Sequence, residues 1–267
     1  MRTGGIHDRS RSSCRQVLTE NRSCTAVHGT GAATVDFSTA AAGYIRTRLA
    51  LDQARDAATA VSRLRHLLDL DSDPVAIDRA LGADPNLAPL VGSNPGTRTP
   101  GCVDAQELLI RSLIGQQVSV STARARTAKL VESLGRSMGD RAVGNRVAVM
   151  FPDSESIAES AHLVLTGPAR RIDAIRHAAE QMCTGKIHLH GGLTATECRA
   201  MLLELPGVSP STADYVTMRL LRDPDTLLPT DLALRRAAKQ RDVGLDRDRW
   251  RPWSSYAMAY LTNTSAP

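Results

Sequence analysis

Apolar residues recur at three- and four-residue spacing along most of the chain, a pattern that predicts amphipathic helices. In residues 53–70 this spacing places one set on a single helical face: Ala57, Val61, Leu64, Leu67 and Leu68. Further helices are expected where the same spacing follows a capping residue or an early proline: 73–81, 104–115, 119–134, 154–165, 169–183, 194–203 and 232–240. No internal repeat of about 20–50 residues is visible, which argues against a solenoid. The pattern predicts a mainly α fold, a helical bundle.

The first residues show a different pattern. Residues 1–42 are rich in Ser, Thr, Gly and Arg, with neither a helical nor an alternating period, so we expect a disordered leader. This leader has no apolar segment of the kind that a secretory signal needs. Residues Gly43–Leu51 do alternate, which predicts a half-buried edge strand. We therefore divide the chain into 1–42, a strand at 43–52, and a helical domain at 53–267.

Composition and charge narrow the function classes. Hydrophobic residues make up 42% and charged residues 23%, as in soluble globular proteins. No apolar run approaches the roughly 20 residues of a membrane helix, so a spanning protein is excluded and no membrane partner is expected. The net charge is +5, but residues 1–50 hold 7 basic and 3 acidic side chains and account for +4 of it. The helical part is thus nearly neutral, and its charge gives little support for nucleic-acid binding.

The cysteines point to a reducing compartment. The chain has five, at wide spacing and without a CxxC pair: Cys14, Cys24, Cys102, Cys183 and Cys198. An odd number at this spacing predicts neither a disulfide framework nor a zinc or iron–sulfur site. We expect a cytoplasmic protein with no metal centre of this kind.

The most informative segment is Leu203–Arg219, which reads LELPGVSPSTADYVTMR. Pro206 and Gly207 form a turn signal, and Ser209 can cap a helix whose first residue is a proline. The pattern predicts a helix–hairpin–helix at about 195–222, with backbone N–H groups exposed at the positive end of the second helix. Such an end binds a phosphate without reading a base. A plain corner between two helices explains these local features equally well.

Four blocks in order resemble a known family. LPGVSPSTA is similar to the helix–hairpin–helix of base-excision DNA glycosylases. LLPTDLALRR resembles the second half of the same signature, a loop that leads to an aspartate. The blocks Thr99–Gly135 and Arg249–Leu261 resemble the AlkA branch, the DNA-3-methyladenine glycosylases, most closely the AlkA half of Ada–AlkA fusions. The resemblance covers about residues 43–262. It implies the helical glycosylase fold plus a short remnant of an N-terminal β domain, because only the strand at Gly43–Leu51 is recognised, and thus an N-terminally truncated chain.

The resemblance also implies an activity and a catalytic residue. The family hydrolyses the N-glycosidic bond of alkylated purines in duplex DNA by base flipping, for bases such as 3-methyladenine and 7-methylguanine. A carboxylate stabilises the positive charge that develops on the sugar, and Asp231 occupies the matching position. Asp231 could instead only cap the helix Leu232–Gln240, with Thr230 as a rival cap. Ser211 stands where strand-nicking members have a lysine, which implies a monofunctional enzyme.

The remaining site residues also come from the resemblance. It implies DNA contacts at the hairpin and at an interhelical turn: Gly207, Val208, Ser209, Ser211, Thr212, Gln116, Gln117 and Ser119. Gln117 matches the residue that fills the gap left by a flipped base. Tyr215 matches a residue of the base pocket, and Trp253 and Tyr256 are further candidates, although two aromatic residues three apart on a helix are more often core.

The implied partner is damaged double-stranded DNA, bound by a monomer in the bacterial cytoplasm near the nucleoid. No cofactor is required, although the turn carbonyls of this family can hold a monovalent cation. Excision of an oxidised purine such as 8-oxoguanine is disfavoured by Ser211. The alternative hypothesis from another class is a non-catalytic DNA-binding remnant of an AlkA-like protein.

Overall fold

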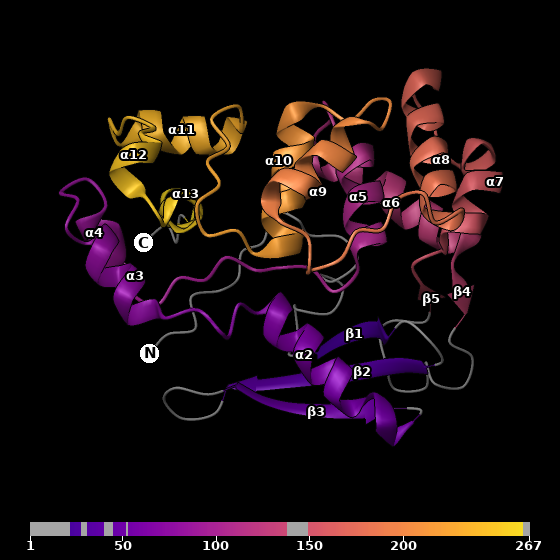
Figure 1. The fold of residues 1–267 in the computed structure, drawn as a ribbon, viewed down its shortest axis with the longest axis horizontal. Helices are drawn as coiled ribbons and strands as arrows, with labels where there is room; N and C mark the ends of the chain where they lie inside the picture. Colours follow the sequence, from indigo (N-terminus) through magenta and orange to yellow (C-terminus); the bar gives the residue numbers. More distant parts are fainter. Residues whose placement is uncertain (1–21, 28–30, 40–44, 52, 138–148, 264–267) are drawn as a thin grey trace.

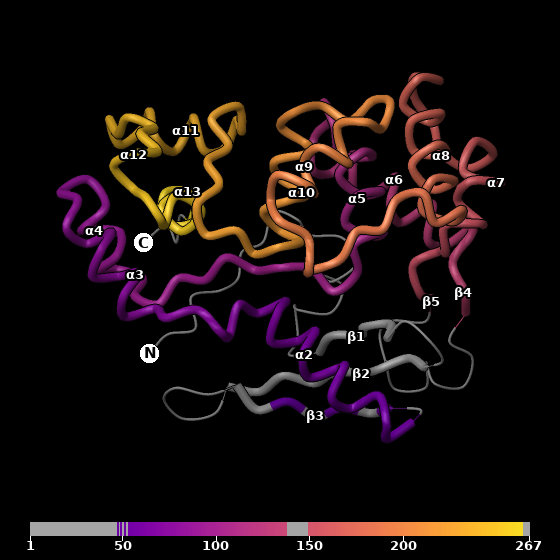
Figure 2. Tube along the Cα trace, in the orientation of Figure 1, coloured from indigo at the N-terminus to yellow at the C-terminus, as the bar shows by residue number. Residues whose placement is uncertain are grey.

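A computed structural model describes residues 22–27, 31–39, 45–51, 53–137 and 149–263 (Figures 1 and 2). The chain begins with an antiparallel three-stranded sheet of order β1-β2-β3. Its strands are β1 (Arg22–Val27), β2 (Gly31–Thr39) and β3 (Ile45–Leu51). Helix α2 (Ala57–Leu67) lies across this sheet in Figure 1. The half-buried Leu49 and Leu51 of β3 pack against Ala60 of α2, so this helix covers one face of the sheet.

This sheet corrects two predictions from the sequence. Residues 22–27 and 31–39 are strands, so the prediction of a disordered leader over 1–42 is wrong for them; residues 1–21, 28–30 and 40–42 lie outside the described parts. The prediction of a single remnant strand is also wrong, because β3 pairs with β2 through Val35↔Leu49 and Ala33↔Leu51. Within β2, Ala33, Val35 and Phe37 alternate with polar residues, a strand period that the Ser- and Thr-rich composition obscures.

The rest of the described chain is helical, as predicted. A 3-10 turn, η1 (Ala54–Asp56), precedes α2. The helices that follow are α3 (Pro74–Leu81), α4 (Ala88–Ser93), α5 (Ala105–Gly115), α6 (Val120–Leu134), α7 (Ser154–Val164), α8 (Ala169–Cys183), α9 (Ala195–Leu203), α10 (Pro210–Leu221), α11 (Leu232–Gln240), α12 (Arg247–Trp250) and α13 (Ser254–Thr262). Two short strands, β4 (Arg136–Ser137) and β5 (Val149–Met150), pair between α6 and α7.

The helices from α3 onward form two groups (Figure 1), and each group has its own hydrophobic core. One core lies among α5 to α10 and contains Leu109, Ile157 and Leu202; the other lies among α3, α4 and α11 to α13 and contains Ile77 and Trp250. Tyr215 of α10 packs against both cores. Helix α10 therefore stands where the two groups meet. None of the helices in the described parts combines the length and apolar character needed to cross a membrane.

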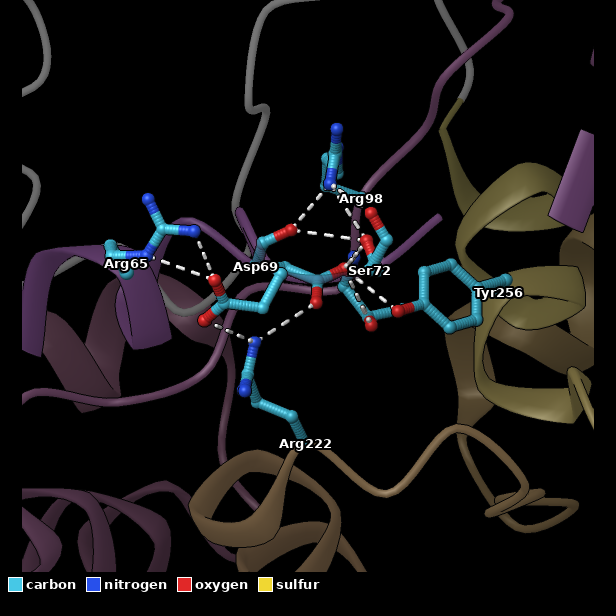
Figure 3. Close-up of polar contacts among 8 residues, drawn as sticks. Arg65, Asp69, Ser72, Arg98, Arg222 and Tyr256 are labelled. Atoms are coloured by element: carbon cyan, nitrogen blue, oxygen red, sulfur yellow. Dashed lines mark hydrogen bonds and ion pairs between the residues drawn. The ribbon is translucent and has the colours of Figure 1, made fainter. Parts of the chain in front are cut away.

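A buried carboxylate ties the two groups together (Figure 3). Asp69, just after α2, is 1% exposed and has a left-handed backbone with φ of 53°. Its side chain accepts hydrogen bonds from Tyr256 Oη at 2.8 Å, Thr99 N at 3.2 Å and Ser72 Oγ at 3.1 Å. Because Tyr256 belongs to α13, this one carboxylate connects segments that are far apart in the sequence.

Arginines surround the same carboxylate. Arg222, the C-cap of α10, lies 3.5 Å from Asp69 and 3.7 Å from Asp71, which Arg65 also contacts. Arg98 donates to the backbone carbonyl of Asp69. Burial lowers the pKa of the neighbouring His66, and the positive charge of Arg222 lowers it further. The cluster therefore fixes the end of α10 between the two helical groups.

Candidate active site

The hairpin between α9 and α10 depends on Gly207 for two reasons. Its φ is +81°, a left-handed conformation that an L side chain rarely adopts. A Cβ placed there would lie 2.6 Å from the Cβ of Ala174 in α8, closer than non-bonded carbon atoms approach one another. The turn therefore packs its backbone directly onto α8, as only glycine permits.

The hairpin presents free backbone donors. Ser209 is the N-cap of α10, and its Oγ accepts from Thr212 N at 3.2 Å. The hydroxyls of Ser211 and Thr212 lie 3.1 and 2.9 Å from the same oxygen. Val208 N donates to Leu205 O, whereas the N–H groups of Gly207 and Ser209 have no acceptor in the described part of the chain. Two amides beside a positive helix end are therefore available for an anion.

The turn between α5 and α6 is joined to this hairpin by one side chain. Gln116 Nε2 donates to Gly207 O at 3.1 Å and to Thr212 Oγ1 at 3.0 Å. The next residue, Gln117, is exposed and has a left-handed φ of 54°. Ser119 caps α6 by accepting from the backbone of Thr122 at 3.1 Å. Gln116 thus holds the two turns side by side, and the side chain of Gln117 is exposed to solvent.

Asp231 is the N-cap of α11. Its Oδ1 accepts from Leu234 N at 2.7 Å, and its backbone N–H donates to Leu228 O at 3.0 Å. The residue is exposed, and within the described residues its side chain forms no ion pair and no second hydrogen bond. Asp231, and not Thr230, is therefore the cap. One carboxylate oxygen is oriented by the helix and the other is open, so capping does not prevent a chemical role.

The aromatic candidates lie in different surroundings. Tyr215 is half-buried, and the guanidinium carbon of Arg219 lies 5.9 Å from its ring centroid. Trp253 is half-buried and packs edge-on against Tyr256, with centroids 5.8 Å apart and planes at 77°. Tyr256 is 2% exposed and bonded to Asp69, which places its ring in the core. Base contact remains a prediction for all of them, with Tyr215 and Trp253 the more accessible.

These elements lie at one edge of the molecule. In Figure 1, α11 and the hairpin between α9 and α10 occupy the same upper edge, and the bonds of Gln116 bring the α5–α6 turn to that hairpin. The α5–α6 turn, the hairpin and Asp231 thus lie at the ends of five helices: α5, α6, α9, α10 and α11. The role of Gln116 in joining the turns and the cluster around Asp69 were not predicted, because no local pattern marks contacts between distant segments.

The groups that the hairpin offers to a cation are backbone carbonyls. Across the described residues, no group of three or more His, Cys, Asp or Glu side chains could hold a metal ion. The carbonyls of Leu205 and Gly207 each accept one hydrogen bond, from Val208 N and from Gln116 Nε2. Each carbonyl keeps a second lone pair, so the turn is compatible with a weakly bound monovalent cation.

Comparisons with known proteins agree with this geometry. The AlkA N-terminal domain family matches residues 13–104, which include the three-stranded sheet. The chain is 40% identical over 233 residues to the probable bifunctional transcriptional activator/DNA repair enzyme AlkA of Mycobacterium tuberculosis (strain CDC 1551 / Oshkosh), covering 85% of this chain and 47% of that protein. It is 30% identical over 218 residues to DNA-3-methyladenine glycosylase 2 of Escherichia coli (strain K12), covering 78% of this chain and 72% of that protein.

A solved structure shows the same fold. The 3-methyladenine DNA glycosylase from Archaeoglobus fulgidus superposes with a TM-score of 0.75 at 19% identity, covering 90% of this chain and 85% of that chain. The mainly helical glycosylase fold predicted from the sequence is thereby confirmed. The chain spans about half the length of the Mycobacterium tuberculosis relative, 47% of it.

Proposed function

Because the chain belongs to the AlkA family of DNA-3-methyladenine glycosylases, we propose that it hydrolyses the N-glycosidic bond of alkylated purines in duplex DNA. The proposal rests on the exposure and the hydrogen bonding of Asp231. This carboxylate is exposed at the upper edge, is oriented through one oxygen by Leu234 N, and forms no ion pair with a described residue.

The chemistry needs such a group. As the base departs, positive charge develops on the deoxyribose, and a carboxylate near C1′ stabilises it. The amide of Leu234 orients one oxygen of Asp231 at the N-terminal end of α11, while the open oxygen faces the substrate or orients the attacking water. Alkylation at N3 or N7 gives the purine a positive charge, so little protonation of the leaving group is required.

The hairpin holds the DNA without reading its sequence. The free N–H groups of Gly207 and Ser209 donate to a backbone phosphate, and the bonds from Gln116 fix the turn that presents them. Gln117 is exposed in the adjacent turn and enters the gap left by the flipped nucleotide. The half-buried Tyr215 offers an electron-rich ring to a cationic base.

The proposed enzyme leaves an abasic site and does not nick the strand. Strand cleavage by this chemistry requires an amine that forms a Schiff base with the sugar. On α10 the position near the hairpin is Ser211, whose hydroxyl lies 3.1 Å from that of Ser209. A hydroxyl cannot form a Schiff base. We also propose that the active unit is a monomer and that a monovalent cation at the turn strengthens DNA binding.

Release of free base from methylated duplex DNA tests the proposal. Wild type is expected to release 3-methyladenine and 7-methylguanine, and Asp231→Asn to release them at least about 100-fold more slowly. Asparagine caps a helix as well as aspartate does, so the variant separates catalysis from capping. Equal release by the two proteins would refute the role of Asp231. No release by a wild type that binds duplex DNA would favour the non-catalytic DNA-binding alternative, and release of 8-oxoguanine alone would change the substrate class.

A further inference from the structure

Helix α11 has three exposed cations on its surface: Arg235, Arg236 and Lys239. In the described structure, none of these three side chains forms a hydrogen bond or an ion pair. In contrast, Arg247 and Arg249 of α12 each form an ion pair with an aspartate. The charges of α11 are thus neutralised by no neighbour that the structure describes.

Two of these cations share a face with the proposed catalytic carboxylate. Asp231, Arg235 and Lys239 are spaced at i, i+4 and i+8, which places them along one stripe of the helix. With a rise of about 1.5 Å per residue, Arg235 lies about 6 Å and Lys239 about 12 Å from Asp231 along the axis. Arg236 is turned by about 140° from Asp231 and about 100° from Arg235, off the face that these two residues share, and lies about 60° from Lys239.

The spacing matches a DNA strand. Each strand carries a phosphate roughly every 3.4 Å of helix axis, so about 6–12 Å corresponds to roughly two to four nucleotides. Arg235 does not pair with Asp231, although it is one turn away, so the carboxylate stays open and the guanidinium remains free for another anion. A strand whose target sugar faces Asp231 and continues along α11 would pass both cations.

We propose that Arg235 and Lys239 bind backbone phosphates of the damaged strand beside the nucleotide whose sugar faces Asp231. The inference rests on the proposed function, since Asp231 marks the target sugar. It extends the DNA contacts from the amides of the hairpin to a second, charged surface on α11. These contacts are uniform binding, made before and during the reaction, so they act on KM more than on kcat.

The salt dependence of DNA affinity tests the proposal without requiring catalysis. The full chain is titrated with a duplex containing a stable tetrahydrofuran abasic analogue over a range of salt concentrations. Arg235→Gln and Lys239→Gln are each expected to reduce the slope of log K against log salt by about 0.9, and the double variant by about 1.8. Arg236→Gln is the matched control for Arg235→Gln, because it is also exposed on α11 and has the same charge change, and it should leave the slope nearly unchanged.

Two results would overturn the proposal. One is a slope that is unchanged in both Arg235→Gln and Lys239→Gln. The other is an equal reduction of the slope in Arg236→Gln, which would indicate that DNA responds to the overall charge of α11 and not to contacts at particular residues. Because these side chains form no hydrogen bond or ion pair in the described structure, nearly equal melting temperatures are expected and would exclude a folding effect. A wild type that releases no base would refute the proposed function, whereas an unchanged slope in an active wild type would refute this inference alone.

Discussion

Replacing Gly207 with alanine tests how the hairpin is built. The substitution adds a single Cβ at a residue whose φ is +81° and whose Cβ would lie 2.6 Å from that of Ala174. The left-handed backbone costs about 1–2 kcal/mol for an L residue. The close contact with α8 adds about 1–3 kcal/mol, since the turn or the helix must shift. We therefore expect Gly207→Ala to lower the free energy of unfolding by about 2–5 kcal/mol.

Urea denaturation measures this loss, and two further variants separate its causes. Gly244→Ala is the matched control, because a Cβ there meets nothing within 4 Å, and its free energy of unfolding should change by less than about 1 kcal/mol. Adding Ala174→Gly to Gly207→Ala removes the clash but not the backbone cost. The double variant should recover about 1–3 kcal/mol beyond the sum of the single effects. If Gly207→Ala is tolerated like Gly244→Ala, or if Ala174→Gly recovers nothing, the account of the hairpin is wrong.

Three further changes follow from the same structure. Asp69→Asn should lower the free energy of unfolding by about 3–5 kcal/mol in urea denaturation, because Arg222 loses a buried charged partner. Asparagine tolerates the positive φ of this position, so the backbone adds little to the loss. A loss below about 1 kcal/mol would contradict this prediction. Burial raises the pKa of Tyr256 above its ordinary value of 10.0, so the folded state keeps a proton that the unfolded state loses. The contribution of Tyr256 to the free energy of unfolding is complete below about pH 10 and falls by about 1.4 kcal/mol per pH unit above it. In denaturation at several alkaline pH values, the free energy of unfolding should therefore fall less steeply with pH for Tyr256→Phe than for wild type. An equal fall in the two proteins would contradict this prediction. Gln116→Ala removes two hydrogen bonds to the hairpin and should lower the free energy of unfolding by about 1–3 kcal/mol. The variant should also bind abasic duplex DNA more weakly, and an unchanged affinity would show that the hairpin does not need these bonds.

The helices were predictable because local signals mark where they start. Asp73, Asp104 and Ser119 each accept a hydrogen bond from the first turn of the helix that follows, as their positions in the sequence indicated. Thr194 forms a capping box with Glu197. These interactions join residues two or three apart, so the sequence alone contains them. The six-residue α4 and four-residue α12 were missed because helices this short show little periodicity.

The N-terminal strands and the tertiary contacts were harder to predict from the sequence. Strand β2 alternates, but its small Ala, Ser and Thr residues give the pattern a low hydrophobic contrast. At the site, the hairpin and Asp231 could be identified from a motif, because they lie within short segments. The bond from Gln116 to Gly207 spans 91 positions and that from Tyr256 to Asp69 spans 187, and no periodicity encodes such pairs.

Treatment of a single-lesion duplex tests the central claim most directly. An end-labelled duplex with one 7-methylguanine is incubated with wild type or with Asp231→Asn, and each sample is analysed with and without an endonuclease that cuts only at abasic sites. We predict that wild type produces a break only after the endonuclease treatment, which reports an abasic site in an intact strand, and that Asp231→Asn produces almost none. A break without the endonuclease would contradict a monofunctional hydrolysis, and equal endonuclease-dependent cleavage by both proteins would contradict catalysis by Asp231.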